Sequence, residues 1–168
     1  MKPVLFALAA IAIAAPAYAA PAPSWVVDKA ASKIGFTSSM SGESFSGSFR
    51  KWDSAIRFDP KNLAGSSVTT TIDMTSAATG DEDRDESLPT AQWFFTTRHP
   101  KATYTATKFK ALGGARYRAD GTLTMRGVAK PVSLPFTLTI TGDTAKMTSA
   151  IDLNRLAFGV GSGEWAST

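Results

Sequence analysis

The alternation of apolar and polar residues over positions 132–141 is the feature that most constrains what this chain can fold into. Serine, proline and threonine occupy the odd positions, while the even positions are apolar: Val132, Leu134, Phe136, Leu138 and Ile140. Successive side chains of a strand point to opposite faces, so this segment predicts a strand with one apolar and one polar face. Residues 122–125 predict the end of a preceding strand, with Arg126 and Gly127 as a tight connection. The apolar face of this β-hairpin then needs a partner, either another sheet or a ligand.

Similar short alternating segments follow one another along the chain. Gly-containing turns separate them at intervals of about 10 residues, which is typical of an all-β sandwich or barrel. We expect short helical turns near residues 81–96, packed over one end of the sheet, because acidic residues there suit a helix N-terminus. The main expected strands are residues 25–28, 32–40, 68–74, 102–111, 116–125, 132–141 and 145–153.

The first 19 residues have the pattern of a signal peptide. Lys2 precedes an apolar run of about a dozen residues, which is shorter than the roughly 20 residues that span a bilayer. Ala17-Tyr18-Ala19 then supplies small residues at the positions that a signal peptidase recognises. We therefore expect residues 1–19 to be removed, a single domain over residues 20–168, no membrane-spanning segment and a periplasmic location.

Composition excludes several functions. The chain contains no cysteine, which excludes thiol catalysis and thiolate metal sites and suits an exported domain held together by burial. The net charge of +4 comes from scattered lysine and arginine residues without a basic run, so nucleic acid is not an expected partner.

Residues suited to catalysis or metal binding are few. Asp81, Asp83 and Asp85 alternate as in an EF-hand loop, but Glu86 and Gln92 stand where that loop needs glycine and a bidentate glutamate. The interpretation is a solvated loop whose carboxylates cap a helix. His99 is the single histidine, and it precedes a proline in no recognisable catalytic motif. The inventory predicts no enzyme, no metal site and no cofactor.

With catalysis and metal binding disfavoured, the apolar face of the expected strands is the remaining candidate for a functional surface. An eight-stranded barrel is wide enough to be filled by such side chains or to hold one small ligand, so the pattern leaves both alternatives open. Flexible methionine and aromatic side chains suit a long apolar guest.

Five sequence blocks resemble the signature blocks of the YceI-like family of secreted lipid-binding proteins. The blocks are W-V-V-D-x-x-x-S-K-I-G-F at 25–36, T-G-D-E-D-R-D-E-S-L at 79–88, W-F-F at 93–95, G-T-L-T-M-R-G-V-A-K-P-V at 121–132 and F-G-V-G-S-G-E-W at 158–165. The resemblance implies an extended, antiparallel, lipocalin-like β-barrel of about eight strands. Its hydrophobic tunnel would bind an amphiphilic lipid such as a polyisoprenoid or an isoprenoid quinone.

On this interpretation the side chains of the inward parity line the tunnel. The expected lipid contacts are Phe36, Phe49, Ile56, Phe58, Ile72, Met74, Phe94, Leu123, Met125, Leu134, Phe136, Leu138, Met147 and Ile151. Basic residues expected in connecting segments could meet an anionic head group. These head-group candidates are Arg84, Arg98, Arg126 and Lys130.

The sequence departs from the family pattern at Ser39, at Ser87 and at its C-terminus. Ser87 stands where many members have a histidine. Any polar role that this histidine has in other members is therefore in doubt for this chain. Family members continue past the G-E-W block into one more strand, so we expect the C-terminal closing strand to be missing and the barrel to have an open edge. A partner strand would fill this edge, for example in a homodimer, or the chain is a truncated product.

These inferences give a leading hypothesis and two alternatives. The leading hypothesis is a periplasmic carrier that holds a long isoprenoid-type lipid inside the barrel. The first alternative is a ligand-free barrel that acts as a stress-response or protein-interaction module. A weaker alternative is a small esterase or isomerase that depends on His99.

Overall fold

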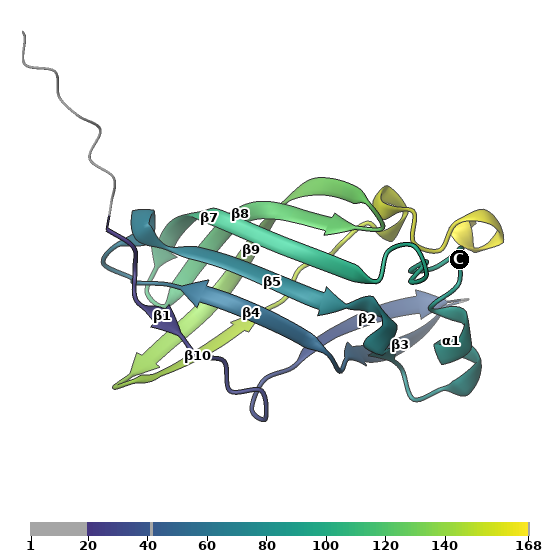
Figure 1. Cartoon of the computed structure of the whole chain (residues 1–168), viewed down its shortest axis with the longest axis horizontal. Helices are drawn as coiled ribbons and strands as arrows, with labels where there is room; N and C mark the ends of the chain where they lie inside the picture. The colour runs from purple at the N-terminus through teal and green to yellow at the C-terminus, as the bar shows by residue number, and fades with distance from the viewer. Residues whose placement is uncertain (1–19, 41, 168) are drawn as a thin grey trace, which may run out of the picture.

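The computed structural model describes residues 20–40 and 42–167 (Figure 1). The predicted signal peptide, residues 1–19, lies outside the described residues. Most of the regular structure is β, as expected, with one short α-helix and four 3-10 turns among the described residues. Eight of the described strands are six residues or longer, which confirms the expected number. They are β2 (Ile34–Met40), β3 (Glu43–Phe49), β4 (Trp52–Arg57), β5 (Ser67–Asp73), β7 (Lys101–Gly113), β8 (Arg116–Met125), β9 (Val128–Thr141) and β10 (Thr144–Ser149).

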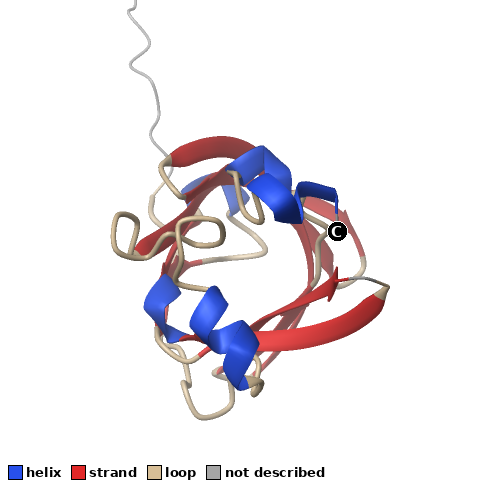
Figure 2. Ribbon diagram, turned by 90° about the vertical axis from the view of Figure 1, so that its right-hand side faces the viewer, coloured by secondary structure: helices blue, strands red, loops and turns tan. Residues whose placement is uncertain are grey.

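Two curled antiparallel sheets enclose the interior. The larger has the order β1-β4-β5-β7-β8-β9-β10, and the smaller has the order β2-β3-β6, where β1 (Ser24–Trp25) and β6 (Ala77–Ala78) are two-residue strands. Most neighbours in the sheets are also neighbours in the chain, as in a meander. Viewed along its length, the molecule is a half-barrel of strands curled around a central axis (Figure 2).

The predicted hairpin at 122–141 is present as β8 and β9. β8 pairs with β9 over its whole length, from Met125 opposite Val128 to Arg116 opposite Thr137. Arg126 and Gly127 form the connection with positive φ angles of 51° and 76°. Positive φ at both central residues matches the right-handed twist of the flanking strands, which is why such turns are favoured in hairpins.

The excursion predicted near residues 81–96 covers one end of the barrel, at the right in Figure 1. It follows the 3-10 turn η2 (Met74–Ser76) and contains α1 (Glu82–Ser87). Asp81 caps α1 by accepting a hydrogen bond from the backbone N–H of Arg84. The turns η3 (Arg155–Phe158) and η4 (Gly163–Ser167) lie at the same end, whereas η1 (Leu63–Gly65) lies near β1.

Two predicted strands are shorter than expected. The first, expected over residues 25–28, ends at Trp25, and Val26 is 97% exposed. The strand expected over 145–153 ends at Ser149, and residues 150–154 lead to η3 without strand pairing. Alternation in these segments was too short to define where pairing stops. No helix in the described part of the chain is long and apolar enough to cross a membrane.

Burial is concentrated in two clusters at opposite ends of the barrel. The α1-end cluster consists of Met74, Leu88, Trp93, Phe94, Ala102, Phe158 and Val160. The β1-end cluster consists of Phe58, Ala106, Ala119 and Phe136. The most deeply buried apolar side chains therefore form one group toward each end of the barrel.

Replacement of Phe58 by alanine tests this distribution. Phe58 is 5% exposed and packs edge-on against Phe109, Tyr117 and Phe136 at centroid distances of 5.3–5.7 Å. We expect Phe58→Ala to lower the free energy of unfolding by about 3–5 kcal/mol, measured by chemical denaturation. The control Val26→Ala removes an almost fully exposed side chain and should leave the midpoint unchanged. Equal effects of the two variants would contradict a core at this end.

Candidate functional site

The candidate site is the inner face of the curled sheets. On β9 the even-numbered residues point inward and the odd-numbered ones are exposed, and the register carries this alternation to β8 and β10. Tyr117 faces Phe136 and Ala119 faces Leu134 on the same side of the sheet. The interior surface is therefore built from alternate residues of consecutive strands.

Aromatic rings dominate the α1 end of this face. The Phe36 ring lies 5.3 Å from Phe49 and 6.3 Å from Phe94, and Phe49 lies 5.9 Å from Phe94. Gly47 faces Phe36 across the β2–β3 pair, and a Cβ there would collide with the Phe36 ring. The glycine thus leaves room for the aromatic ring against β3.

The β1 end has its own aromatic group. Tyr117 and Phe136 stack at 5.6 Å with an interplanar angle of 24°. Next to them a pocket of about 460 Å³ opens from the surface. Tyr117, Phe136 and Leu112 contribute its apolar lining. An apolar group could therefore reach the β1-end cluster through this pocket.

The inner face is incompletely covered by protein. Inward residues such as Ile56, Leu134 and Leu138 are only half-buried. Ile140 and Met147, which lie at inner positions of β9 and β10, are 38% and 50% exposed. In addition, no large side chain of the described residues is completely buried. Several inward apolar side chains, most of all on β9 and β10, therefore remain in contact with solvent.

The structure brings together twelve of the fourteen lipid contacts expected from the sequence. Met74 and Phe94 belong to the α1-end cluster, and Phe58 and Phe136 belong to the β1-end cluster. The other eight pack against one cluster or the other: Phe36, Phe49, Ile72, Leu123 and Met125 at the α1 end, and Ile56, Leu134 and Leu138 at the β1 end. Met147 lies on the exposed strand β10, and Ile151 follows it outside any strand.

Several lining residues escaped the sequence interpretation. Phe109 and Tyr117 pack against the β1-end cluster, and Trp93 belongs to the α1-end cluster. A register shift in β7 between Ala106 and Lys108 changes the parity, which brings Phe109 to the inner face. Such a bulge leaves no reliable trace in an alternation pattern. The inward parity of Tyr117, opposite Phe136, was the available signal for that residue.

Arg126 serves the structure at the α1 end. Its guanidinium donates hydrogen bonds to the carbonyl oxygens of Ala91 at 2.9 Å, Trp93 at 2.5 Å and Gly159. These bonds connect the β8–β9 turn to two segments that cover the α1 end, one at residues 91–93 and one at Gly159. Burial lowers the pKa of the guanidinium. Because its donors are already engaged, Arg126 is placed to hold these covering segments rather than a head group.

The other three basic candidates differ in their surroundings. Arg84 forms an ion pair with Asp81 at 3.0 Å and lies 4.9 Å from the Phe45 ring centroid. Arg98 is exposed in the connection before β7. Lys130 is not in a connecting segment, as the sequence interpretation had it, but at a half-buried inner position of β9. The four cations therefore do not form one head-group site.

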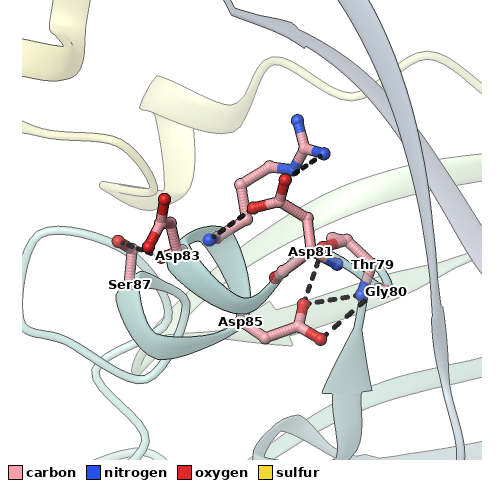
Figure 3. A network of polar contacts seen from close by, with 7 residues as sticks. Thr79, Gly80, Asp81, Asp83, Asp85 and Ser87 are labelled. Atoms are coloured by element: carbon pink, nitrogen blue, oxygen red, sulfur yellow. Dashed lines mark hydrogen bonds and ion pairs between the residues drawn. The ribbon is translucent and has the colours of Figure 1, made fainter.

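The acidic loop is a structural cap, as its sequence indicated (Figure 3). Asp85 accepts hydrogen bonds from the Thr79 backbone N–H at 2.6 Å and from the Thr79 hydroxyl at 2.7 Å. These bonds, with that from Gly80, lower the pKa of Asp85. Among residues 20–40 and 42–167, no three acidic or histidine side chains are grouped in a way that could hold a metal ion.

Comparison with known proteins gives the chain its family. A family model described as the YceI-like domain matches residues 25–168. The chain belongs to the YceI-like family. This confirms the resemblance inferred from the five sequence blocks.

Related sequences and structures agree with this membership. A UPF0312 protein of Pectobacterium carotovorum subsp. carotovorum is 41% identical over 97 residues, which are 58% of this chain and 50% of that protein. Protein YceI of Shigella flexneri is 40% identical over the same shares. The YceI-like chain thus spans about half the length of these curated relatives.

Solved structures show the same fold. The crystal structure of BcnA from Burkholderia cenocepacia superposes with a TM-score of 0.80 at 33% identity, over 83% of this chain and 88% of that one. A polyisoprenoid-binding domain from Saccharophagus degradans, implicated in plant cell wall breakdown, gives a TM-score of 0.58 at 15% identity, over 75% and 74% of the chains. At that identity the second likeness is one of fold alone.

The role of Arg126 is tested by Arg126→Met. The variant loses the guanidinium donors and leaves carbonyl oxygens of the cover without partners, so the free energy of unfolding should fall by about 2 kcal/mol. Chemical denaturation measures the change. The control Arg98→Met removes an exposed guanidinium and should alter stability by less than about 0.5 kcal/mol. An unchanged midpoint for Arg126→Met would refute the assigned role.

The cap at Asp85 predicts a pH dependence. Its folded pKa lies below the ordinary value of 3.8, so its stabilisation is present above about pH 4 and is lost as pH falls through the folded pKa. Asp85→Asn should therefore melt at a lower temperature than wild type at neutral pH, and the difference should shrink in acid. Asp83→Asn, an exposed neighbour on α1, provides the control. A difference that stays constant from neutral pH to pH 3 would contradict this explanation.

Proposed function

We propose that this protein is a periplasmic, non-enzymatic carrier that holds the apolar chain of an isoprenoid-type amphiphile against the inner face of its barrel. The observation that carries the proposal is the incomplete coverage of that face. Ile140 and Met147 point inward yet are 38% and 50% exposed. Apolar surface of this kind is stabilised when it is removed from water, which an apolar guest would do.

Other observations support the same function. The two clusters leave apolar side chains of both ends facing a shared interior, which suits an elongated guest better than a compact one. The exposed inner residues include aliphatic and methionine side chains, which adapt to a flexible chain. Membership of the YceI-like family and the fold shared with a polyisoprenoid-binding domain favour a lipid of the isoprenoid class. The export signal predicted at residues 1–19 motivates the periplasmic location.

Native mass spectrometry of gently purified protein tests the proposal. We expect a bound species in the mass range of a long-chain lipid, released by organic extraction, and uptake of an added C20 isoprenoid by delipidated protein. Leu138→Asp places a charge on the inner face and should reduce uptake, whereas Thr139→Asp, on the outer face of the same strand, should not. Absence of bound lipid together with no uptake would refute the carrier and favour the ligand-free module.

Fractionation of the source cells tests the periplasmic location. The homodimer remains a prediction, which sedimentation analysis would test.

A further inference from the structure

Polar side chains interrupt the apolar inner face between the two clusters. Ser54 faces Thr70 across β4 and β5, with their hydroxyl oxygens 2.7 Å apart, and Thr70 faces Tyr104 across β5 and β7. The inner positions of β5 on either side are Ile72, which packs against the α1-end cluster, and Val68, which packs against the β1-end cluster. The interior thus has a polar level between two apolar ends.

Tyr104 extends this polar level across β8 to β9. Its ring covers Gly121, where a Cβ would lie 2.9 Å from Tyr104 Cζ. The Tyr104 hydroxyl lies 2.9 Å from the Ala119 carbonyl oxygen and 3.2 Å from the Val132 carbonyl oxygen. Burial, together with the negative charge of Asp120, raises the pKa of Tyr104 to about 12, so the hydroxyl keeps its proton at neutral pH. The single proton of this hydroxyl is shared between the two carbonyl groups, so the hydroxyl can donate to a further oxygen only by turning away from them.

Lys130 is the inner residue of β9 next to Val132. Inner residues two apart on one strand are separated by about 7 Å. Since the Tyr104 hydroxyl bonds the carbonyl of Val132, it and Lys130 border the same part of the interior. Lys130 is half-buried opposite Leu123, which packs against the α1-end cluster. No residue of 20–40 or 42–167 forms a hydrogen bond or ion pair with its ammonium group.

No ion pair within the described residues neutralises the charge of Lys130. Among the inner positions of the described strands, the other charged residue is Glu43, which is exposed at the first residue of β3. A cation against an apolar surface is unfavourable unless water or an anion meets it. An ammonium group, unlike a hydroxyl, recognises chiefly negative charge and can give several hydrogen bonds to oxygen.

We propose that Lys130 and Tyr104 form a subsite for the oxyanion head group of the bound amphiphile, on the inner wall of the barrel rather than at its rim. This inference rests on the proposed function, because the tail of the same ligand would occupy the apolar surface. It names the ligand class: a long-chain phosphate or carboxylate rather than a neutral alcohol or quinone. Lys130 supplies the charge, and Tyr104 supplies a rotatable hydroxyl beside it.

Two ligands that differ only in the head group test the subsite. Delipidated protein is titrated with geranylgeranyl phosphate and with geranylgeraniol, and tryptophan fluorescence reports binding. We expect wild type to bind the phosphate about tenfold more tightly, the value of one charge-assisted contact. Lys130→Met should abolish this preference by weakening binding of the phosphate, Lys130→Arg should retain it, and Tyr104→Phe should reduce it. Lys146→Met, on the outer parity of β10, is the matched control.

The outcomes separate this inference from the function on which it rests. If both lipids bind wild type equally, or if Lys130→Met keeps the preference for phosphate, the subsite is wrong while the carrier function stands. If neither lipid binds wild type, the carrier function fails as well. Displacement of geranylgeranyl phosphate by millimolar inorganic phosphate would indicate a free-anion site and overturn the assignment to a lipid head group. Circular dichroism confirms that each variant is folded.

Discussion

The register of the β8–β9 hairpin is the constraint on which the interior depends. Two residues with positive φ, Arg126 and Gly127, connect the strands and fix which residues face one another. A shift of one residue would turn Leu134, Phe136 and Leu138 outward and bring threonine and proline inward. The same turn carries the guanidinium that binds the covering segments at the α1 end. Strand pairing and the attachment of the cover are therefore set at one point of the chain.

The fold class and most of the inner face could be predicted because both follow from a period of two. Alternation identified β9, the hairpin and eleven inward residues that the structure places in or against the two clusters. The acidic loop was also recognisable as a helix cap, because Asp81 precedes a short acidic segment. These are local properties, in which each residue type acts on its sequence neighbours.

Properties that depend on residues far apart in sequence could not be predicted. The engagement of Arg126 depends on carbonyl groups about 35 residues away, so sequence alone could not distinguish it from a free cation. Lys130 was placed in a connection because the strand was taken to begin at Val132, whereas pairing with β8 extends it to Val128. The bulge after Ala106 changed the parity of β7 and hid Phe109. Tertiary pairing decided each of these cases.

The prolines of β9 have a consequence for assembly. β10 pairs with β9 from Phe136 to Thr141, so residues 128–135 have a described strand neighbour on one side, which is β8. The Pro135 carbonyl accepts a hydrogen bond from Ser149, which places the polar groups of the odd residues on the β10 side. Pro131 and Pro135 remove backbone donors from that border, so it is a poor template for edge-to-edge aggregation. Apolar surface can thus lie next to a strand border without making the protein prone to fibre-like association.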